Sequence, residues 1–137
     1  YFGYKLPQND LNCEDFRSRA RAWADARRAL DLFRRQNIPF HDMDNHDELV
    51  GNVNRGNALY CFAKPGELYL VYLPRGGSAK LDLSGVSGQF ALQWFNPRSD
   101  TDLLPGRPPE IRAGAVVTIG PPPVEADEDW LAVLRRR

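Results

Sequence analysis

The chain has 137 residues, 18 basic and 18 acidic side chains, a formal net charge of zero and only two cysteines. This length suits one domain that folds without a disulfide or a metal. Balanced charge gives no basic excess to attract phosphates, so nucleic acid is not an expected partner. No apolar run reaches the roughly 18 residues of a membrane span, so no membrane contact is expected. The first residue is Tyr rather than Met, and no signal peptide follows, so we expect a piece of a longer protein.

The first third of the chain has the three- and four-residue apolar spacing of a helix, from residue 12 to about residue 37. Asn12 is the expected N-cap, Glu14 and Asp15 suit the first turn, and Pro39 lies just beyond the expected end. The apolar stripe is formed by Phe16, Ala20, Trp23, Ala26, Leu30 and Phe33. We expect this stripe to pack against a neighbouring layer, not to line a cofactor site, and predict no cofactor.

The connector over residues 39–57 is polar and irregular. It gathers His41, Asp42, Asp44, His46 and Asp47 within seven residues. Side chains of this kind can bind zinc or calcium, but the segment lacks the Gly pivot and terminal Glu of a calcium loop and has no zinc-protease motif. We therefore predict a solvated connector ordered by Asn and Asp turns, with a metal site at His41, Asp42, Asp44 and His46 as the alternative. Cys13 and Cys61 match no zinc spacing and are expected to be two separate buried thiols.

The stretch from residue 57 to residue 134 alternates apolar and polar residues between Pro and Gly turns. Residues 58–63 and 67–73 form a predicted hairpin, in which Pro65 and Gly66 suit a type II turn. Further strands are expected near residues 79–83, 90–94, 111–119 with a break at Gly114, and 130–134. The prediction is a mainly β protein, an antiparallel β-sandwich of about six to eight strands preceded by one long N-terminal helix.

Strand parity also predicts which side chains lie between the two sheets. They are Leu81, Leu83, Phe90, Leu92, Trp94, Val117, Ile119 and Trp130. Phe95 falls on the opposite face of its strand, and residues 68–73 are apolar at every position, as though both faces of that strand were covered.

No catalytic constellation stands out. The carboxylates of the sheet region are Glu67, Asp82, Asp100, Asp102 and Glu110. They fall at strand ends or at outward positions, so no two are expected to share the cleft that a glycosidase needs. The two histidines lie in the connector, and no nucleophile elbow occurs. Exposed aromatic rings are the remaining option for gripping sugars or collagen, and the candidates are Tyr69, Tyr72 and Phe95.

Two groups of motifs carry a resemblance to known proteins. Residues 1–5, 10–11 and 14–19 resemble the last barrel unit of the bacterial apiosidase-like glycoside hydrolases. The turn Trp94-Phe95-Asn96-Pro97-Arg98, with Pro121-Pro122 and the ending from Asp129-Trp130 to Leu134, resembles the β-sandwich that follows this barrel, known as the putative collagen-binding domain of a collagenase. The resemblance implies a helical segment and connector over residues 1–47 and a sandwich over residues 48–137. The family's catalytic carboxylates lie on earlier barrel strands, so no catalytic residue is implied here.

The resemblance implies a non-catalytic C-terminal accessory domain of a larger bacterial hydrolase, which is secreted or periplasmic. Its implied partners are the catalytic barrel of its own parent chain and collagen or a polysaccharide. A structural alternative stays open, in which the sandwich packs on a glycoside hydrolase barrel and stabilises it without a ligand of its own. The apolar stripe of the helix favours this alternative, because it needs a neighbour.

Overall fold

The computed structural model describes residues 16–54 and 58–137, and the predicted N-cap Asn12 and the Cys13 thiol lie outside them. The helical elements are η1 (Phe16–Arg19), α1 (Ala20–Arg35), η2 (Phe40–Asp42) and η3 (Asp47–Val50). The strands of this part are β1 (Asp44–Asn45), β2 (Tyr60–Lys64), β3 (Leu68–Leu73), β4 (Ala79–Asp82), β5 (Gln89–Phe95), β6 (Leu104–Arg112), β7 (Val116–Ile119) and β8 (Trp130–Arg136). The mainly β prediction with one N-terminal helix is confirmed.

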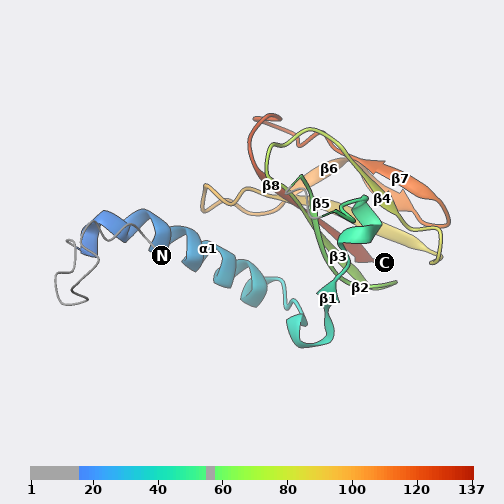
Figure 1. Cartoon of the computed structure of the whole chain (residues 1–137), viewed down its shortest axis with the longest axis horizontal. Coiled ribbons are helices and arrows are strands. Elements are labelled where there is room, and N and C mark those ends of the chain that lie inside the picture. The colour runs from blue at the N-terminus through green and yellow to red at the C-terminus, as the bar shows by residue number, and fades with distance from the viewer. Residues whose placement is uncertain (1–15, 55–57) are drawn as a thin grey trace.

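The strands form a six-stranded sheet in the order β1-β2-β3-β8-β5-β6 and a two-stranded sheet of β4 and β7, and all pairs are antiparallel. The predicted hairpin is β2–β3, and its turn holds Gly66 at a φ of 83°, where glycine has no steric penalty. The last strand, β8, lies between β3 and β5 in the middle of the larger sheet (Figure 1). The end of the chain is therefore an integral part of the fold.

The main core lies between the two sheets and contains the side chains that strand parity predicts. Trp94 and Trp130 are fully buried, and their rings meet edge to face with centroids 6.4 Å apart. Val117 alone of the predicted set is partly buried, packed against the edge of this core. The core prediction is confirmed.

A second apolar cluster covers the outer face of the six-stranded sheet. It combines Leu68, Leu70, Phe95 and Val133 from the sheet with Leu32, Ile38 and Met43 from α1 and the connector. Both faces of β3 are thus covered, as its unbroken apolar sequence predicts. The end of α1 is also fixed by a polar contact, in which Arg135 of β8 donates a 2.6 Å hydrogen bond to the carbonyl of Gln36.

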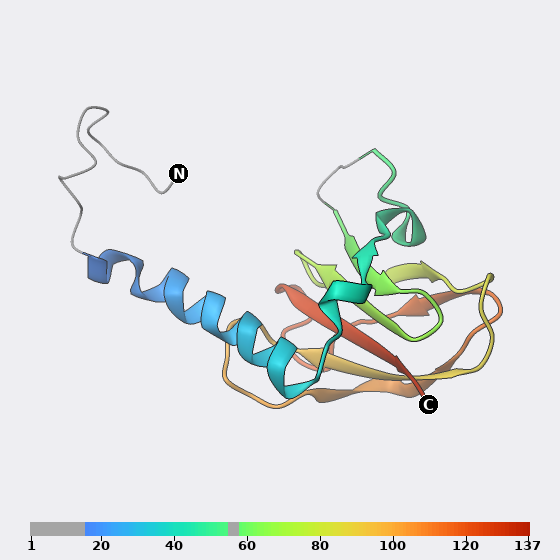
Figure 2. The same cartoon turned by 90° about the horizontal axis from the view of Figure 1, so that it is seen from below.

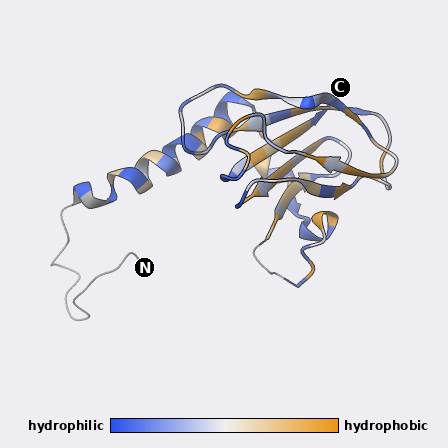
Figure 3. Cartoon of the chain, turned by 90° about the horizontal axis from the view of Figure 1, so that it is seen from above, coloured by the Kyte–Doolittle hydropathy of each residue, from blue (hydrophilic) through white to orange (hydrophobic). Residues whose placement is uncertain are grey.

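The apolar contacts of α1 with the sandwich lie at the C-terminal end of the helix. The remainder of the helix projects away from the sheets in both views (Figures 1 and 2). Trp23 and Leu30 are 66% and 56% exposed, whereas Leu32, which lies off the predicted stripe, is buried. Of the predicted stripe, Phe33 at the helix end packs against the second apolar cluster, whereas Trp23 and Leu30 lie away from the docked face. Apolar bands recur along the projecting helix (Figure 3), and none of the described helices is long and apolar enough to cross a membrane.

Strand β6 is longer than the sequence indicates. Three prolines lie between Leu104 and Arg112, and proline cannot donate to a sheet ladder, so the pattern reads as a loop. The strand forms because it lies at the edge of the sheet, where the missing donors are tolerated. Gly106 faces Leu92 so closely that a Cβ atom would come within 2.5 Å of that side chain, which explains glycine at this position.

Candidate functional site

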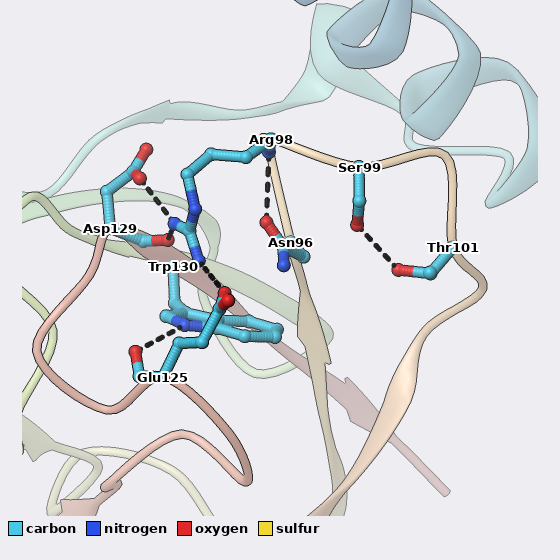
Figure 4. A network of polar contacts seen from close by, with 7 residues as sticks. All are labelled: Asn96, Arg98, Ser99, Thr101, Glu125, Asp129 and Trp130. Atoms are coloured by element: carbon cyan, nitrogen blue, oxygen red, sulfur yellow. Dashed lines mark hydrogen bonds and ion pairs between the residues drawn. The ribbon is translucent and has the colours of Figure 1, made fainter.

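The turn that follows β5 belongs to the motif Trp94-Phe95-Asn96-Pro97-Arg98, and it places Arg98 beside the start of β8. The side-chain oxygen of Asn96 accepts a 2.9 Å hydrogen bond from the backbone N–H of Arg98, which closes the turn. The guanidinium of Arg98 then reaches both the backbone carbonyl and the carboxylate of Asp129, and it donates a 2.8 Å hydrogen bond to Glu125 (Figure 4). Its central carbon lies 5.6 Å from the centre of the Trp130 ring.

Further hydrogen bonds tie this network to the sheet. Trp130 donates from its indole nitrogen to the carbonyl of Glu125 at 3.2 Å, and Tyr72 of β3 donates to Asp129 at 3.1 Å. Burial raises the pKa of the Tyr72 hydroxyl, and the bond to Asp129 raises it further, so Tyr72 keeps the proton that it donates. Both carboxylates are engaged by one guanidinium. The arrangement therefore holds two loops together.

A pocket of about 400 Å³ lies between α1 and the segment that joins β5 to β6. Leu32, Phe95 and Leu103 supply apolar lining. Arg28 spans the gap, with ion pairs of 3.0 Å to Asp100 and 2.7 Å to Asp25. Asp100 and Asp102 line the pocket together with Asp31 of the helix. The expectation that no two carboxylates of the sheet region share a pocket is therefore wrong, because the helix closes a space over the loop that holds them.

The three aromatic candidates have different environments. Tyr69 is 1% exposed, packs edge to face on Phe90, and its hydroxyl accepts a 2.7 Å hydrogen bond from the backbone N–H of Gly66. Phe95 is 8% exposed beneath α1. The expectation of exposed rings is wrong for both, since Tyr69 lies in the main core between the sheets and Phe95 lies on the outer face, which the helix end and the connector cover. Tyr72 is half-buried and stacks on Tyr60 with ring centres 6.3 Å apart, so its role in binding stays a prediction.

The candidate metal ligands of the polar connector are not brought together at one point. His41 lies 3.5 Å from Asp42, and His46 lies 2.8 Å from Glu48. Asp44 belongs to β1 and is exposed. Across residues 16–54 and 58–137, no three His, Cys, Asp or Glu side chains are grouped to hold a metal ion. The neighbouring Asp47 instead accepts a 2.7 Å hydrogen bond from the backbone N–H of Cys61 and so pins the connector to β2.

Fold and site together define a β-sandwich domain with a helix docked by its end. Residues 46–135 match the family described as "Putative collagen-binding domain of a collagenase", and the chain belongs to this family. No curated protein matches the chain.

Two similar solved structures are glycoside hydrolases. One, a family 5 glycoside hydrolase from Bacteroides vulgatus ATCC 8482, has a TM-score of 0.63 at 14% identity, and covers 85% of this chain and 24% of its own. The other, titled "Glycoside hydrolase", has a TM-score of 0.66 at 12% identity, and covers 90% of this chain and 28% of its own. The chain thus spans about a quarter of the length of these proteins. Residues 46–137 make up less than 85% of the chain. The structural similarity therefore extends into the helical segment before residue 46.

Proposed function

We propose that this chain is the non-catalytic C-terminal accessory part of a larger bacterial hydrolase that is secreted or periplasmic. Family membership and the similarity to two longer glycoside hydrolases support this role. In this proposal, residues 1–47 form the end of a catalytic barrel and the connector, and residues 48–137 form the sandwich. The family match begins at residue 46, which supports this division.

The observation that carries the proposal is the exposed apolar face of α1. Trp23 and Leu30 lie seven residues apart on one side of the helix and are mostly exposed. Full burial of such side chains is worth roughly 1.5 to 3 kcal/mol each, so the helix has a face that a second protein surface would stabilise. We assign that surface to the catalytic barrel of the parent chain. The sandwich then acts as a support that packs on the barrel and fixes the helix at its other end.

The variants Trp23→Ser and Leu30→Ser test this role in two settings. In the 137-residue chain, both side chains are exposed, so the melting temperature should hardly change. In the full-length parent enzyme, the same variants should lower the stability of the catalytic part, because they remove its contact with α1. Val116→Ser is the matched control, since Val116 is 57% exposed and lies on β7, away from the helix. An equal, small effect of all three variants in the parent would contradict the support role.

Lack of catalysis is tested with the purified chain on gelatin and on chromogenic glycosides. We expect no turnover of either, because the carboxylates of the Arg98 network are engaged and Asp100 is paired with Arg28. Turnover that survives repurification and disappears in Asp100→Asn or Asp102→Asn would refute the non-catalytic assignment.

Binding to collagen is the second candidate function, and the family description and the stacked Tyr60–Tyr72 pair favour it. Flat rings of this kind grip polyproline-like chains and sugars. A pull-down of the chain on collagen and on plant polysaccharides tests this function. Retention that Tyr72→Ala abolishes would support a binding module, and loss of retention only in Trp23→Ser would instead point to the helix face.

A further inference from the structure

One face of α1 lines the pocket with residues at helical spacing. Ala24, Arg28 and Leu32 are four residues apart, and Arg27, Asp31 and Arg35 form the parallel row. The opposite wall is the segment 99–103, which leaves β5 just after the Arg98 turn. Two regions that are far apart in the sequence thus meet around one space, and the Arg28–Asp100 ion pair holds them together.

The pocket has an apolar base and polar side chains that include both hydrogen-bond donors and hydrogen-bond acceptors. Leu32 and Phe95 are nearly buried and supply carbon surface, whereas Ser99 and Thr101 supply hydroxyls that bond each other at 3.0 Å. The carboxylate of Asp102 and the guanidinium of Arg35 have no ion-pair or hydrogen-bond partner within residues 16–54 and 58–137, and both side chains are exposed. One of them accepts hydrogen bonds and the other donates them, so the pocket offers both functions to a ligand.

The charge of the lining restricts the ligand further. The charged lining residues are Arg27, Arg28, Arg35, Asp31, Asp100 and Asp102. Three positive and three negative side chains cancel, so the pocket has no excess charge for a strongly anionic or cationic ligand. A volume of about 400 Å³ is at the small end of the 300 to 1,000 Å³ range of small-molecule pockets. Collagen, as a triple helix, is too wide for such a space.

We propose that this pocket binds one neutral sugar unit, such as a terminal residue of a polysaccharide. Sugar hydroxyls donate and accept hydrogen bonds, which suits adjacent Arg, Asp, Ser and Thr side chains, and the C–H face of the ring suits Leu32 and Phe95. The inference rests on the proposed accessory role, since a domain attached to a glycoside hydrolase encounters saccharides. It adds a ligand site to a domain that otherwise acts as a support.

The test is an amide NMR titration of the ¹⁵N-labelled chain with glucose, galactose, xylose and arabinose, with galacturonate as the anionic arm. At least one neutral sugar should shift amides within residues 27–36 and 99–103. Asp102→Asn and Arg35→Gln should each weaken that binding by about tenfold, because each loses a charge-assisted hydrogen bond. Both side chains are exposed, so these variants should keep the fold. The matched controls Asp44→Asn and Arg75→Gln change exposed charges outside the pocket and should leave the affinity unchanged.

Three results would overturn the inference. They are no shift of the pocket amides with any neutral sugar, a response to galacturonate alone, and neutral-sugar binding that neither Asp102→Asn nor Arg35→Gln weakens. These failures are separable from failure of the accessory role, which is read from the stability of the parent enzyme with Trp23→Ser. If that variant destabilises the parent while no sugar binds, the support role stands and the sugar site is wrong.

Discussion

Replacement of Arg98 by Ala should destabilise the domain by about 2 to 4 kcal/mol, because one side chain holds the β5–β6 loop to the start of β8. The side chains of Arg98 and Asp129 are only 25% and 26% exposed, so their hydrogen bonds fall in the range of roughly 1.5 to 3 kcal/mol for charged partners. The contact with Trp130 adds about 0.5 to 1 kcal/mol. Glu125 is 60% exposed, so solvent screening limits its pair to below about 1 kcal/mol.

Urea unfolding followed by tryptophan fluorescence measures this cost. Arg98→Lys should recover less than half of the loss, because an ammonium group cannot reproduce the planar fork that reaches Asp129 and Glu125 together. Glu125→Gln is the graded control and should cost below about 1 kcal/mol. In a double-mutant cycle, Arg98→Ala and Asp129→Ala should show a coupling energy above about 0.5 kcal/mol. If Arg98→Ala costs less than about 0.5 kcal/mol, the network is a surface feature and the structural role assigned to the turn is wrong.

Trp94→Ala should cost about 3 to 5 kcal/mol in the same urea assay, and a loss below about 1 kcal/mol would show that the ring is not in the core. Burial raises the pKa of the Cys61 thiol to about 12, so in a Cys13→Ser chain Cys61 should resist alkylation near pH 8 until the chain unfolds. The neutral buried thiol contributes stability that is present below the ordinary thiol pKa and lost as pH rises toward 12, and rapid native alkylation would contradict this. Amides near Leu32 should exchange hydrogen more slowly than those near Trp23, and equal rates would contradict docking by the helix end.

Period-two patterning was sufficient to predict the sandwich and its core. Buried strands need apolar side chains at alternate positions, so Leu81, Leu92 and Trp94 could be assigned from parity alone. The edge strand β6 could not, because its prolines are acceptable only where a ladder has no outer neighbour, and its Gly106 is required by the close approach of Leu92 on β5. Strand β6 forms because it lies at the edge of the sheet, and this position cannot be derived from the local sequence.

The functional features were harder to predict, because they depend on contacts between residues that are far apart in the sequence. The Trp94–Arg98 turn and Asp129-Trp130 were visible in the sequence as a resemblance, but their shared role needs the pairing of β5 with β8. Likewise, Arg28 and Asp100 are 72 positions apart, so no motif links them into one pocket. Helical periodicity placed Trp23 and Leu30 on one face correctly, yet it could not show that the sheet contacts Leu32 instead. A stripe indicates that a helix has a neighbour without identifying it.

Apolar burial holds α1 to the sandwich more than ion pairing does. Asp100 is 81% exposed, so its pair with Arg28 is screened by solvent and contributes below about 1 kcal/mol. Burial of Leu32 contributes roughly 1.5 to 3 kcal/mol, and the neighbouring Ile38 and Met43 anchor the chain that follows. These contacts lie at the C-terminal end of the helix, so they fix its direction without covering Trp23. A helix fixed at one end with its apolar face exposed is suited to a second partner, because binding then costs little additional ordering of the helix.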